Sequence, residues 1–283
     1  MKRGSKRPAE KTLQSGGKTK LGGMMLRCLP FLFVWGCSAL FIPTNWAKAA
    51  FVAFTLSTGD LEGVFGEGWR AEPPSFVKGD FERLDDGDDA AFYATPRFVE
   101  HIDDRAVKAL TKYNDDVLKG SSTALDLCGS WNSHVTKAPS VQFAGLGMNA
   151  DELNRNQMLT ERVVMDLNKR SGGQPVSLPW PDATFDNVLL QLSVDYLIQP
   201  IEVFKEIHRV LRPGGRVHVS FSNRVFIDKA VASWTGKSDM THIEQVGDYL
   251  RLSGFSISPT ALELAVSAKG LDPLYVVVGQ KEQ

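Results

Sequence analysis

Cysteine is scarce in this chain, which holds only three among 283 residues. Cys28 and Cys37 fall within the first 49 residues, so Cys128 stands alone in the rest of the chain. A lone thiol excludes an intramolecular disulfide framework there. No cluster of cysteine and histidine has metal-ligand spacing, and no glycine-rich phosphate cradle occurs. The sequence therefore predicts neither a structural metal site nor a phosphate-binding loop.

An excess of basic residues is also missing, because 32 Lys and Arg face 33 Asp and Glu. The balance is uneven along the chain. The first 27 residues carry eight Lys or Arg against one acid, Glu10, so the remaining chain is acidic, with a formal charge of −8. An acidic body without a basic stripe argues against nucleic acid as a partner. With 43% hydrophobic and 23% charged residues, the chain suits one globular domain plus an extension.

The chain lacks a long uninterrupted hydrophobic run. The most apolar stretch, residues 29–42, is short and is broken by Pro30 and Gly36, so a membrane span is disfavoured. A basic head, this apolar stretch and the small-x-small triplet 47–49 together predict a targeting leader over residues 1–49 that is removed. The alternative is a retained membrane anchor, which would be the only membrane contact.

The leader has two interpretations. Either Met24 or Met25 starts a secretory signal, or residues 1–23 form a first organelle address that precedes the apolar one. The second pattern resembles bipartite plastid targeting. We therefore expect a plastid location, with the secretory pathway or membrane anchoring as the alternative.

Residues 50–91 are poorly periodic and become acidic toward D-D-G-D-D at 85–89. A calcium loop would need a bidentate Glu and further ligands at set spacing, which are absent. We predict a solvated loop there, within an acidic linker that precedes a domain of residues 92–283.

From residue 103 onward, apolar residues alternate between helical and strand spacing, which predicts an α/β fold with a largely parallel sheet. Helices are predicted at 103–118, 150–156, around 201–211, 225–234 and 240–252. Strands are predicted at 124–127, 141–146, 163–166, 187–192, 216–221, 261–266 and 274–278. Ligands bind outside the carboxyl ends of such strands, so the loops after the first four strands are the candidate site.

Residues 178–215 contain L-P-W-P-D-A-T-F-D, then V-L-L-Q-L, then E-I-H-R-V-L-R-P-G-G. This ordered string resembles the back half of a class I S-adenosylmethionine methyltransferase of the small-molecule type 11 kind. The resemblance covers roughly residues 92–280. It implies a doubly wound, Rossmann-like sheet of seven strands, mostly parallel with an antiparallel last strand. In it, Pro213 ends the helix and Gly214 and Gly215 turn the chain into the fifth strand.

The resemblance also implies where the cofactor binds. S-adenosylmethionine offers a ribose diol, an adenine amine and a methionine end, so its site needs carboxylates and closely approaching backbone. In place of the family's D-x-G-x-G-x-G, this chain has D-L-C-G-S-W-N at 126–132, and it has G-L-G-M-N at 145–149 where the family has a diol-binding acid. The cofactor-binding residues it implies are Asp126, Cys128, Gly129, Ser130, Gly147, Asn149, Asp166, Leu167 and Gln191.

The rewritten first loop, S-W-N-S-H at 130–134 together with G-L-G-M-N, resembles a branch of the family seen in plants, algae and cyanobacteria. It supports the plastid expectation and implies no particular substrate. His134 is the candidate general base, with a histidine that only supports the loop as the alternative. Cys128 is a reactive thiol or a buried small residue, and Asp195 and Tyr196 fall where the family places acceptor-facing groups.

Methyl transfer to an oxygen, nitrogen or carbon of a small-molecule acceptor is the leading functional hypothesis. The alternative is a non-catalytic, methyltransferase-like binding or assembly protein, in which Trp131 fills the pocket. A nicotinamide dehydrogenase is the third and weakest, because no G-x-G-x-x-G follows the first predicted strand. An open cavity beside Gly129 and Asp166 favours the enzyme, and a filled one favours the binding protein.

Overall fold

The computed structural model describes residues 74–169, 174–255 and 259–283. The predicted leader at 1–49 and most of the predicted linker lie outside the described residues. Within the described part, no helix is long and apolar enough to cross a membrane.

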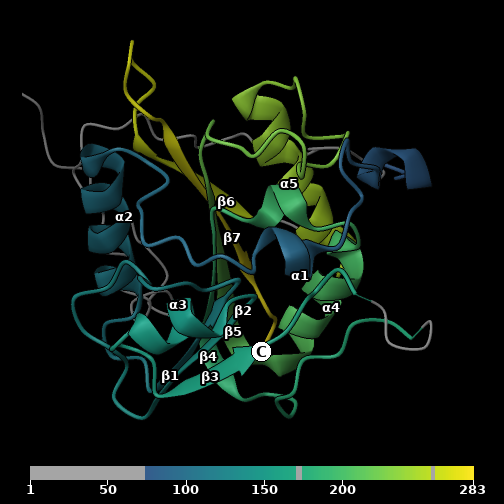
Figure 1. The fold of residues 1–283 in the computed structure, drawn as a ribbon. Coiled ribbons are helices and arrows are strands. Elements are labelled where there is room, and N and C mark those ends of the chain that lie inside the picture. The colour runs from purple at the N-terminus through teal and green to yellow at the C-terminus, as the bar shows by residue number, and fades with distance from the viewer. Residues whose placement is uncertain (1–73, 170–173, 256–258) are drawn as a thin grey trace, which may run out of the picture. The chain divides into compact units, whose positions relative to one another are not determined.

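Seven strands of the described chain form one sheet in the order β3-β2-β1-β4-β5-β7-β6 (Figure 1). Strand β7 runs antiparallel to both of its neighbours, β5 and β6, and the remaining pairs are parallel. The predicted fold class is confirmed. The strands are β1 (Thr123–Leu127), β2 (Gln142–Gly147), β3 (Glu161–Val164), β4 (Phe185–Gln191), β5 (Leu211–Phe221), β6 (Thr260–Ala265) and β7 (Leu274–Gln280).

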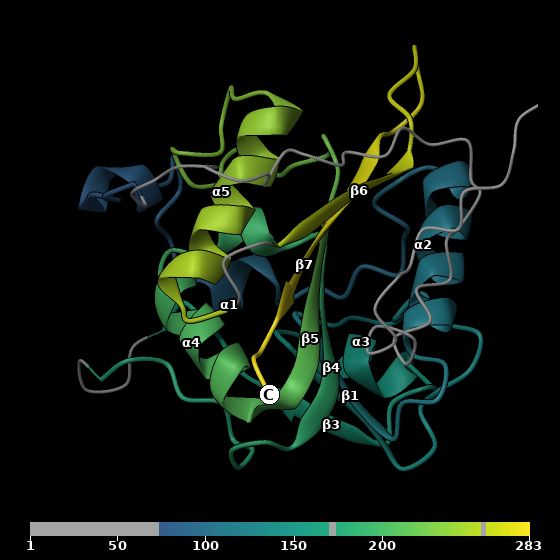
Figure 2. The same cartoon turned by 180° about the vertical axis from the view of Figure 1, so that it is seen from behind.

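Helices cover both faces of the sheet, with α2 and α3 on one side and α4 and α5 on the other (Figures 1 and 2). The α-helices are α1 (Asp89–Phe92), α2 (Asp104–Val117), α3 (Ala150–Arg155), α4 (Pro200–Val210) and α5 (Asp239–Leu252), and two short 3₁₀ turns span Lys78–Phe81 and Val194–Tyr196. The Asp103 carboxylate accepts a hydrogen bond from Ala106 N and so caps α2.

Side chains of the central strands alternate between the two helical layers. Leu125 and Leu127 of β1 pack in the cluster that contains α4 and α5, whereas Ala124 packs with Leu153 of α3. The sheet is therefore buried on both faces, which explains why its strands read as nearly continuous apolar runs.

Strand β5 begins earlier than predicted, at Leu211 instead of residue 216. Leu211 already pairs with Phe185, and the register then shifts so that Arg216 pairs with Asn187. The residues between form a bulge in which Gly214 has φ 79°. The Pro-Gly-Gly segment therefore lies inside the strand, and its prediction as a turn before the strand was wrong.

The helix predicted at 225–234 is also absent from this part of the described chain, which forms turns instead. The backbone N–H groups of Val231, Ala232 and Ser233 donate to the carbonyls of Asp195, Glu82 and Asp80. These donors are therefore used for tertiary contacts and are not available to a helix. The apolar residues at 225–234 serve tertiary packing, since Phe226 contacts Phe92 and His101 and Val231 and Trp234 belong to the main core.

Asp89 departs from the predicted solvated loop, because its side chain is 5% exposed. Arg83 Nη1 donates to both of its carboxylate oxygens at 2.9 Å, and Lys229 Nζ lies 3.2 Å away. Burial opposes ionisation of Asp89, but hydrogen bonds from Arg83 and Asn168 outweigh it and keep its pKa below the usual value. Asp89 thus anchors residues 82–93 to the domain.

Candidate active site

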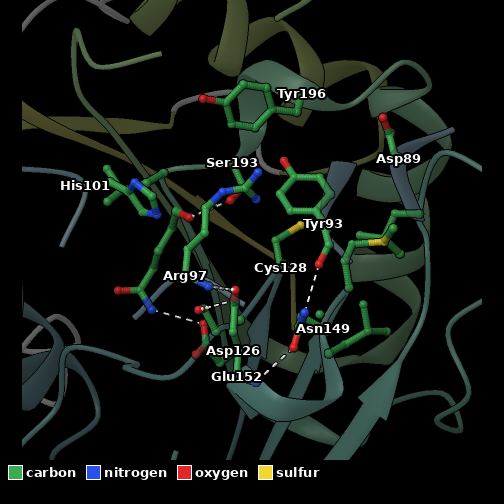
Figure 3. A pocket seen from close by; sticks show the side chains of 18 of the residues that line it. Asp89, Tyr93, Arg97, His101, Asp126, Cys128, Asn149, Glu152, Ser193 and Tyr196 are labelled. Carbon is green, nitrogen blue, oxygen red and sulfur yellow. Dashed lines mark hydrogen bonds between the residues drawn. The ribbon is translucent and has the colours of Figure 1, made fainter. Parts of the chain in front are cut away.

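One cavity of about 330 Å³ lies at the carboxyl ends of β1, β2 and β4 (Figure 3). Its walls include every residue that the sequence placed at a cofactor or catalytic site, and their roles toward a ligand stay predictions. These residues are Asp126, Cys128, Gly129, Ser130, His134, Gly147, Asn149, Asp166, Leu167 and Gln191. The parallel strands bring them together because their carboxyl ends share one edge of the sheet.

Asp126 is the penultimate residue of β1, and its buried side chain is 1% exposed. Ser133 Oγ donates to it at 2.6 Å and Gln191 Nε2 at 3.0 Å. Burial raises the pKa of Asp126 to about 6, against the lowering effect of these two bonds. Gln191 in turn accepts from Asn114 Nδ2 at 2.8 Å, so Asp126 and Gln191 fix the loop after β1 to β4 and α2.

The loops after β1 and β2 approach each other through glycine backbone. A Cβ built on Gly147 would lie 2.1 Å from Gly129 O, and one built on Gly129 would lie 2.9 Å from an Asp126 carboxylate oxygen. Any side chain at Gly147 would force the two loops apart. The backbone geometry therefore requires glycine at Gly147, and a side chain at Gly129 would displace the Asp126 carboxylate.

Cys128 stands where the resembled pattern has its first glycine, and it has φ 60°, in the left-handed region that favours glycine. Burial raises the pKa of its thiol to about 12, so the thiol is neutral at neutral pH. Its sulfur faces the cavity in Figure 3, between Tyr93 above and Asp126 below. Of the two interpretations of Cys128, the unreactive residue fits these observations.

Asn149 is fully engaged within the protein. Its Oδ1 accepts from Asp151 N and Glu152 N and so caps α3, while its Nδ2 donates to Tyr93 O at 2.9 Å and Ala94 O at 3.2 Å. Asp151 is exposed and lies outside the cavity wall. Neither residue supplies a free carboxylate at the end of β2.

Glu152 supplies the carboxylate there, and the sequence analysis missed it. Its side chain lines the cavity, is 9% exposed, and accepts from Arg97 N and Ser130 Oγ, each at 2.6 Å. The resembled family pattern has its acid at the end of the second strand, whereas Glu152 lies in the first turn of α3. A buried acid three residues after a helix-capping Asn is the signal that could have indicated it.

Asp166 and Leu167 follow β3 and also line the cavity. Asn168 N donates to the Asp166 carboxylate at 2.8 Å, and burial of the half-buried carboxylate raises its pKa. Leu167 is buried, and its carbonyl accepts from Gln199 Nε2. Asp166 therefore offers an acceptor beside an apolar surface, as an adenine ring requires.

His134 lies at the cavity wall, with φ 49° and 8% of its surface exposed. Its backbone N–H donates to Asn132 Oδ1, and its carbonyl accepts from Asn114 Nδ2. Burial lowers the pKa of its imidazole despite Glu100, whose carboxylate lies 3.7 Å from Nε2. The residue supports the loop through its backbone and presents a neutral imidazole to the cavity.

Tyr93, Arg97 and His101 close the cavity from the segment before α2, and no sequence signal pointed to them. Tyr196 also lines it, as the sequence placed it, whereas Asp195 is buried outside the wall with its pKa raised to about 7 by burial. Within the described residues, no group of three or more His, Cys, Asp or Glu is arranged to hold a metal ion.

With this geometry established, three comparisons bear on the class of protein. The fold and site are those of a Rossmann-like α/β domain with a ligand cavity at the carboxyl edge of its sheet. Residues 129–219 match the family model described as "Methyltransferase domain". The match runs from the loop after β1 nearly to the end of β5 and includes most of the cofactor-binding residues predicted from the sequence.

The curated relatives are methyltransferases with different acceptors in their names. Demethylmenaquinone methyltransferase of Geobacillus sp. (strain WCH70) is 30% identical over 117 residues, or 38% of this chain and 50% of the relative. Malonyl-[acyl-carrier protein] O-methyltransferase of Marinomonas sp. (strain MWYL1) is 31% identical over 68 residues, or 24% and 25%. The chain thus spans half or less of the length of these relatives.

Among solved structures, the chain is similar to 1,6-didemethyltoxoflavin-N1-methyltransferase of Burkholderia thailandensis, which contains 1,6-didemethyltoxoflavin and S-adenosylhomocysteine. The identity is 15%, the TM-score is 0.44, and the alignment covers 64% of this chain and 80% of the other.

Proposed function

We propose that this chain is an S-adenosylmethionine-dependent methyltransferase that acts on a small molecule. The observation that carries the proposal is a cavity whose wall includes Gly129, Gly147 and Asp166, three residues of the segment that matches the methyltransferase domain. The match to curated methyltransferases supports it.

Residues of the cavity wall fit the cofactor's chemistry. The ribose diol and the two amino groups of S-adenosylmethionine are donors, and the wall offers the carboxylates of Asp126, Glu152 and Asp166. Glu152 takes the place of the acid that is missing at the end of β2. The glycine backbones of Gly129 and Gly147 leave room for a ligand to approach the main chain.

The bound cofactor would supply an electrophilic methyl group on a sulfonium. The protein's contribution is to hold and orient. The Asp126–Gln191 pair fixes the first loop, Glu152 and Asp166 accept from the nucleoside, and the segment carrying Tyr93 and Arg97 covers the site from water. His134 lies at the wall as a weak base with a neutral imidazole.

The alternative, a non-catalytic binding protein with Trp131 in the pocket, finds less support. Trp131 is not part of the cavity wall, and its indole N–H donates to Val99 O at 3.4 Å. Gly129 and Asp166 both border open space. This is the arrangement that favours the enzyme.

Isothermal titration of the full-length chain with S-adenosylmethionine and with S-adenosylhomocysteine tests the proposal. We expect both to bind with micromolar affinity at one site per chain. Absence of heat with both ligands, in a sample whose folding is verified by circular dichroism, would remove the enzyme hypothesis.

We also propose that residues 1–49 direct the chain to a plastid, and that the chain belongs to the plant, algal and cyanobacterial branch of the family. The eight basic residues at 1–27, the apolar stretch and the rewritten first loop support this. A fusion of residues 1–49 to a fluorescent protein should enter chloroplasts of plant cells. Fluorescence in the endoplasmic reticulum or at its membrane would support the secretory or anchored alternative.

A further inference from the structure

The upper end of the cavity differs in chemistry from the carboxylate-rich lower end. Tyr93, Tyr196 and Phe226 line it together with Arg97 and His101. Figure 3 shows Tyr93 and Tyr196 above Cys128 and Arg97 beside it, with Asp126, Asn149 and Glu152 below it and Asp89 at the upper right. The two ends belong to one cavity, so a ligand at the upper end lies next to one at the lower end.

The aromatic rings at this end form a connected group around Arg97. The Arg97 guanidinium carbon lies 4.5 Å from the ring centre of Phe92 and 5.7 Å from those of Tyr93 and Phe226. The Phe226 ring in turn lies 6.0 Å from that of Tyr196 and 5.5 Å from that of His101. The rings come from separate segments of the chain, and they hold the guanidinium by stacking.

Arg97 has no carboxylate partner among the described residues. Its guanidinium donates to Phe92 O at 2.9 Å, and no ion pair joins it to an acid. The nearby acids are engaged elsewhere: Asp89 pairs with Arg83 and Lys229, and Glu152 accepts from the Arg97 backbone and from Ser130. A stacked guanidinium with spare donors at a cavity wall recognises a planar anion, because its fork matches a carboxylate.

The other cations at this end do not compete for that anion. Arg224 is paired with Asp272 at 2.7 Å. Burial and the neighbouring Arg97 lower the pKa of His101, so its imidazole is neutral at neutral pH. The positive charge at the upper end is therefore concentrated on Arg97.

We infer that the methyl acceptor is a planar aromatic molecule with a negative group, which Arg97 binds while Tyr93, Tyr196 and Phe226 contact its ring. This inference rests on the proposed function, since it assigns the substrate class of the same site. The rings supply apolar contact area and Arg97 supplies the charge that orients the acceptor toward the cofactor end.

The test uses 2-naphthoate as the probe, with uncharged 2-naphthamide and non-aromatic cyclohexanecarboxylate as controls, titrated into the full-length chain with and without S-adenosylhomocysteine. We expect 2-naphthoate to bind at least tenfold more tightly than either control. Arg97→Met should weaken 2-naphthoate at least tenfold and leave 2-naphthamide nearly unchanged, and Arg97→Lys should fall between.

Arg155→Met is the matched control, because Arg155 also stacks on a ring, that of Phe98 at 6.0 Å, but lies outside the cavity wall. It should bind 2-naphthoate like the wild type. The inference is overturned if wild type does not bind 2-naphthoate, if it binds 2-naphthamide equally well, or if Arg97→Met and Arg97→Lys, both folded, bind 2-naphthoate normally.

The two proposals fail separately in this design. If 2-naphthoate binds in an Arg97-dependent way but S-adenosylhomocysteine does not bind, the methyltransferase proposal is contradicted and the Arg97 anion site is supported. Binding of S-adenosylhomocysteine without Arg97-dependent binding of 2-naphthoate would do the reverse.

Discussion

Glu152 is the residue on which the cofactor end of the cavity depends most. Asn149, which the sequence resemblance aligns with an acid, uses both of its polar atoms within the protein, to cap α3 and to hold the 93–94 backbone. Glu152 is buried at the same wall. Its carboxylate accepts one hydrogen bond from Arg97 N and one from Ser130 Oγ, and its remaining lone pairs can accept from a ligand. The carboxylate at this wall therefore comes from a residue about one helical turn after Asn149.

Glu152→Gln should weaken binding of S-adenosylhomocysteine about tenfold or more, because a hydrogen bond to a charged group contributes about 1.5–3 kcal/mol. The control is Glu161→Gln. Glu161 also accepts two side-chain donors, from Gln142 and Trp180, but lies outside the cavity wall. Equal affinities of the two variants in isothermal titration would show that Glu152 is only structural.

The sequence predicts which residues line the cavity best where the strands fix them. Asp126 and Gly147 lie at the carboxyl ends of β1 and β2 and Asp166 follows β3, so their meeting at one edge of the sheet was predictable. Glu152 and Arg97 were not, because a residue inside a helix and one in an irregular segment enter the cavity only through tertiary contacts.

At the scale of elements, the segment from 82 to 101 is held over the site by a buried ionic cluster. Lys229 is 1% exposed, and its ammonium lies 3.0 Å from Asp85 and 3.2 Å from Asp89. It also donates to Gly87 O at 2.9 Å. The turns at 226–234 position this lysine, and their backbone forms hydrogen bonds with the backbone at 80–85.

Lys229→Met should lower the free energy of unfolding by about 3 kcal/mol, since it leaves buried acceptors without their cation. Lys112→Met is the control, because Lys112 forms an exposed pair with Asp116 one turn away and such pairs contribute about 0.5 kcal/mol or less. Urea unfolding measures both. A loss for Lys229→Met as small as that of the control would contradict the proposed anchoring.

Backbone hydrogen bonds explain why no helix forms at 225–234. The apolar residues there have helical spacing, but the N–H groups of Val231 and Ala232 donate to Asp195 O and Glu82 O, which are distant in sequence. The predicted start of β5 was wrong for a related reason. The bulge that contains Pro213 and Gly214 depends on pairing with β4, which is distant in sequence. The periodicity of apolar residues indicates which side chains are buried, but it does not indicate which acceptors the backbone N–H groups bind.

At the scale of the whole molecule, the stability should depend on pH through buried titratable groups. His218 joins three elements: its Nδ1 lies 2.8 Å from Tyr113 OH of α2 and its Nε2 lies 3.1 Å from Asn187 Oδ1 of β4. Burial lowers its pKa to about 3. The folded state therefore binds fewer protons than the unfolded state between about pH 3 and the ordinary histidine value.

The stability that His218 contributes is thus present above pH 6.5 and is lost as the pH falls toward 3. Asp126 and Asp195, with raised pKa values, act in the opposite sense over part of this range. We expect His218→Gln to reduce the slope of unfolding free energy against pH between 6 and 4 by up to about 1.4 kcal/mol per unit. Urea unfolding at several pH values measures this, and parallel curves for the two proteins would contradict it.

We propose that the cavity at the ends of β1, β2 and β4 holds S-adenosylmethionine. A crystal structure of the chain with S-adenosylhomocysteine would show the ligand's position. We expect the nucleoside between Gly129 and Asp166, with the Glu152 carboxylate on the ribose hydroxyls. A ligand bound elsewhere, or a cavity that stays empty at saturating concentration, would contradict it.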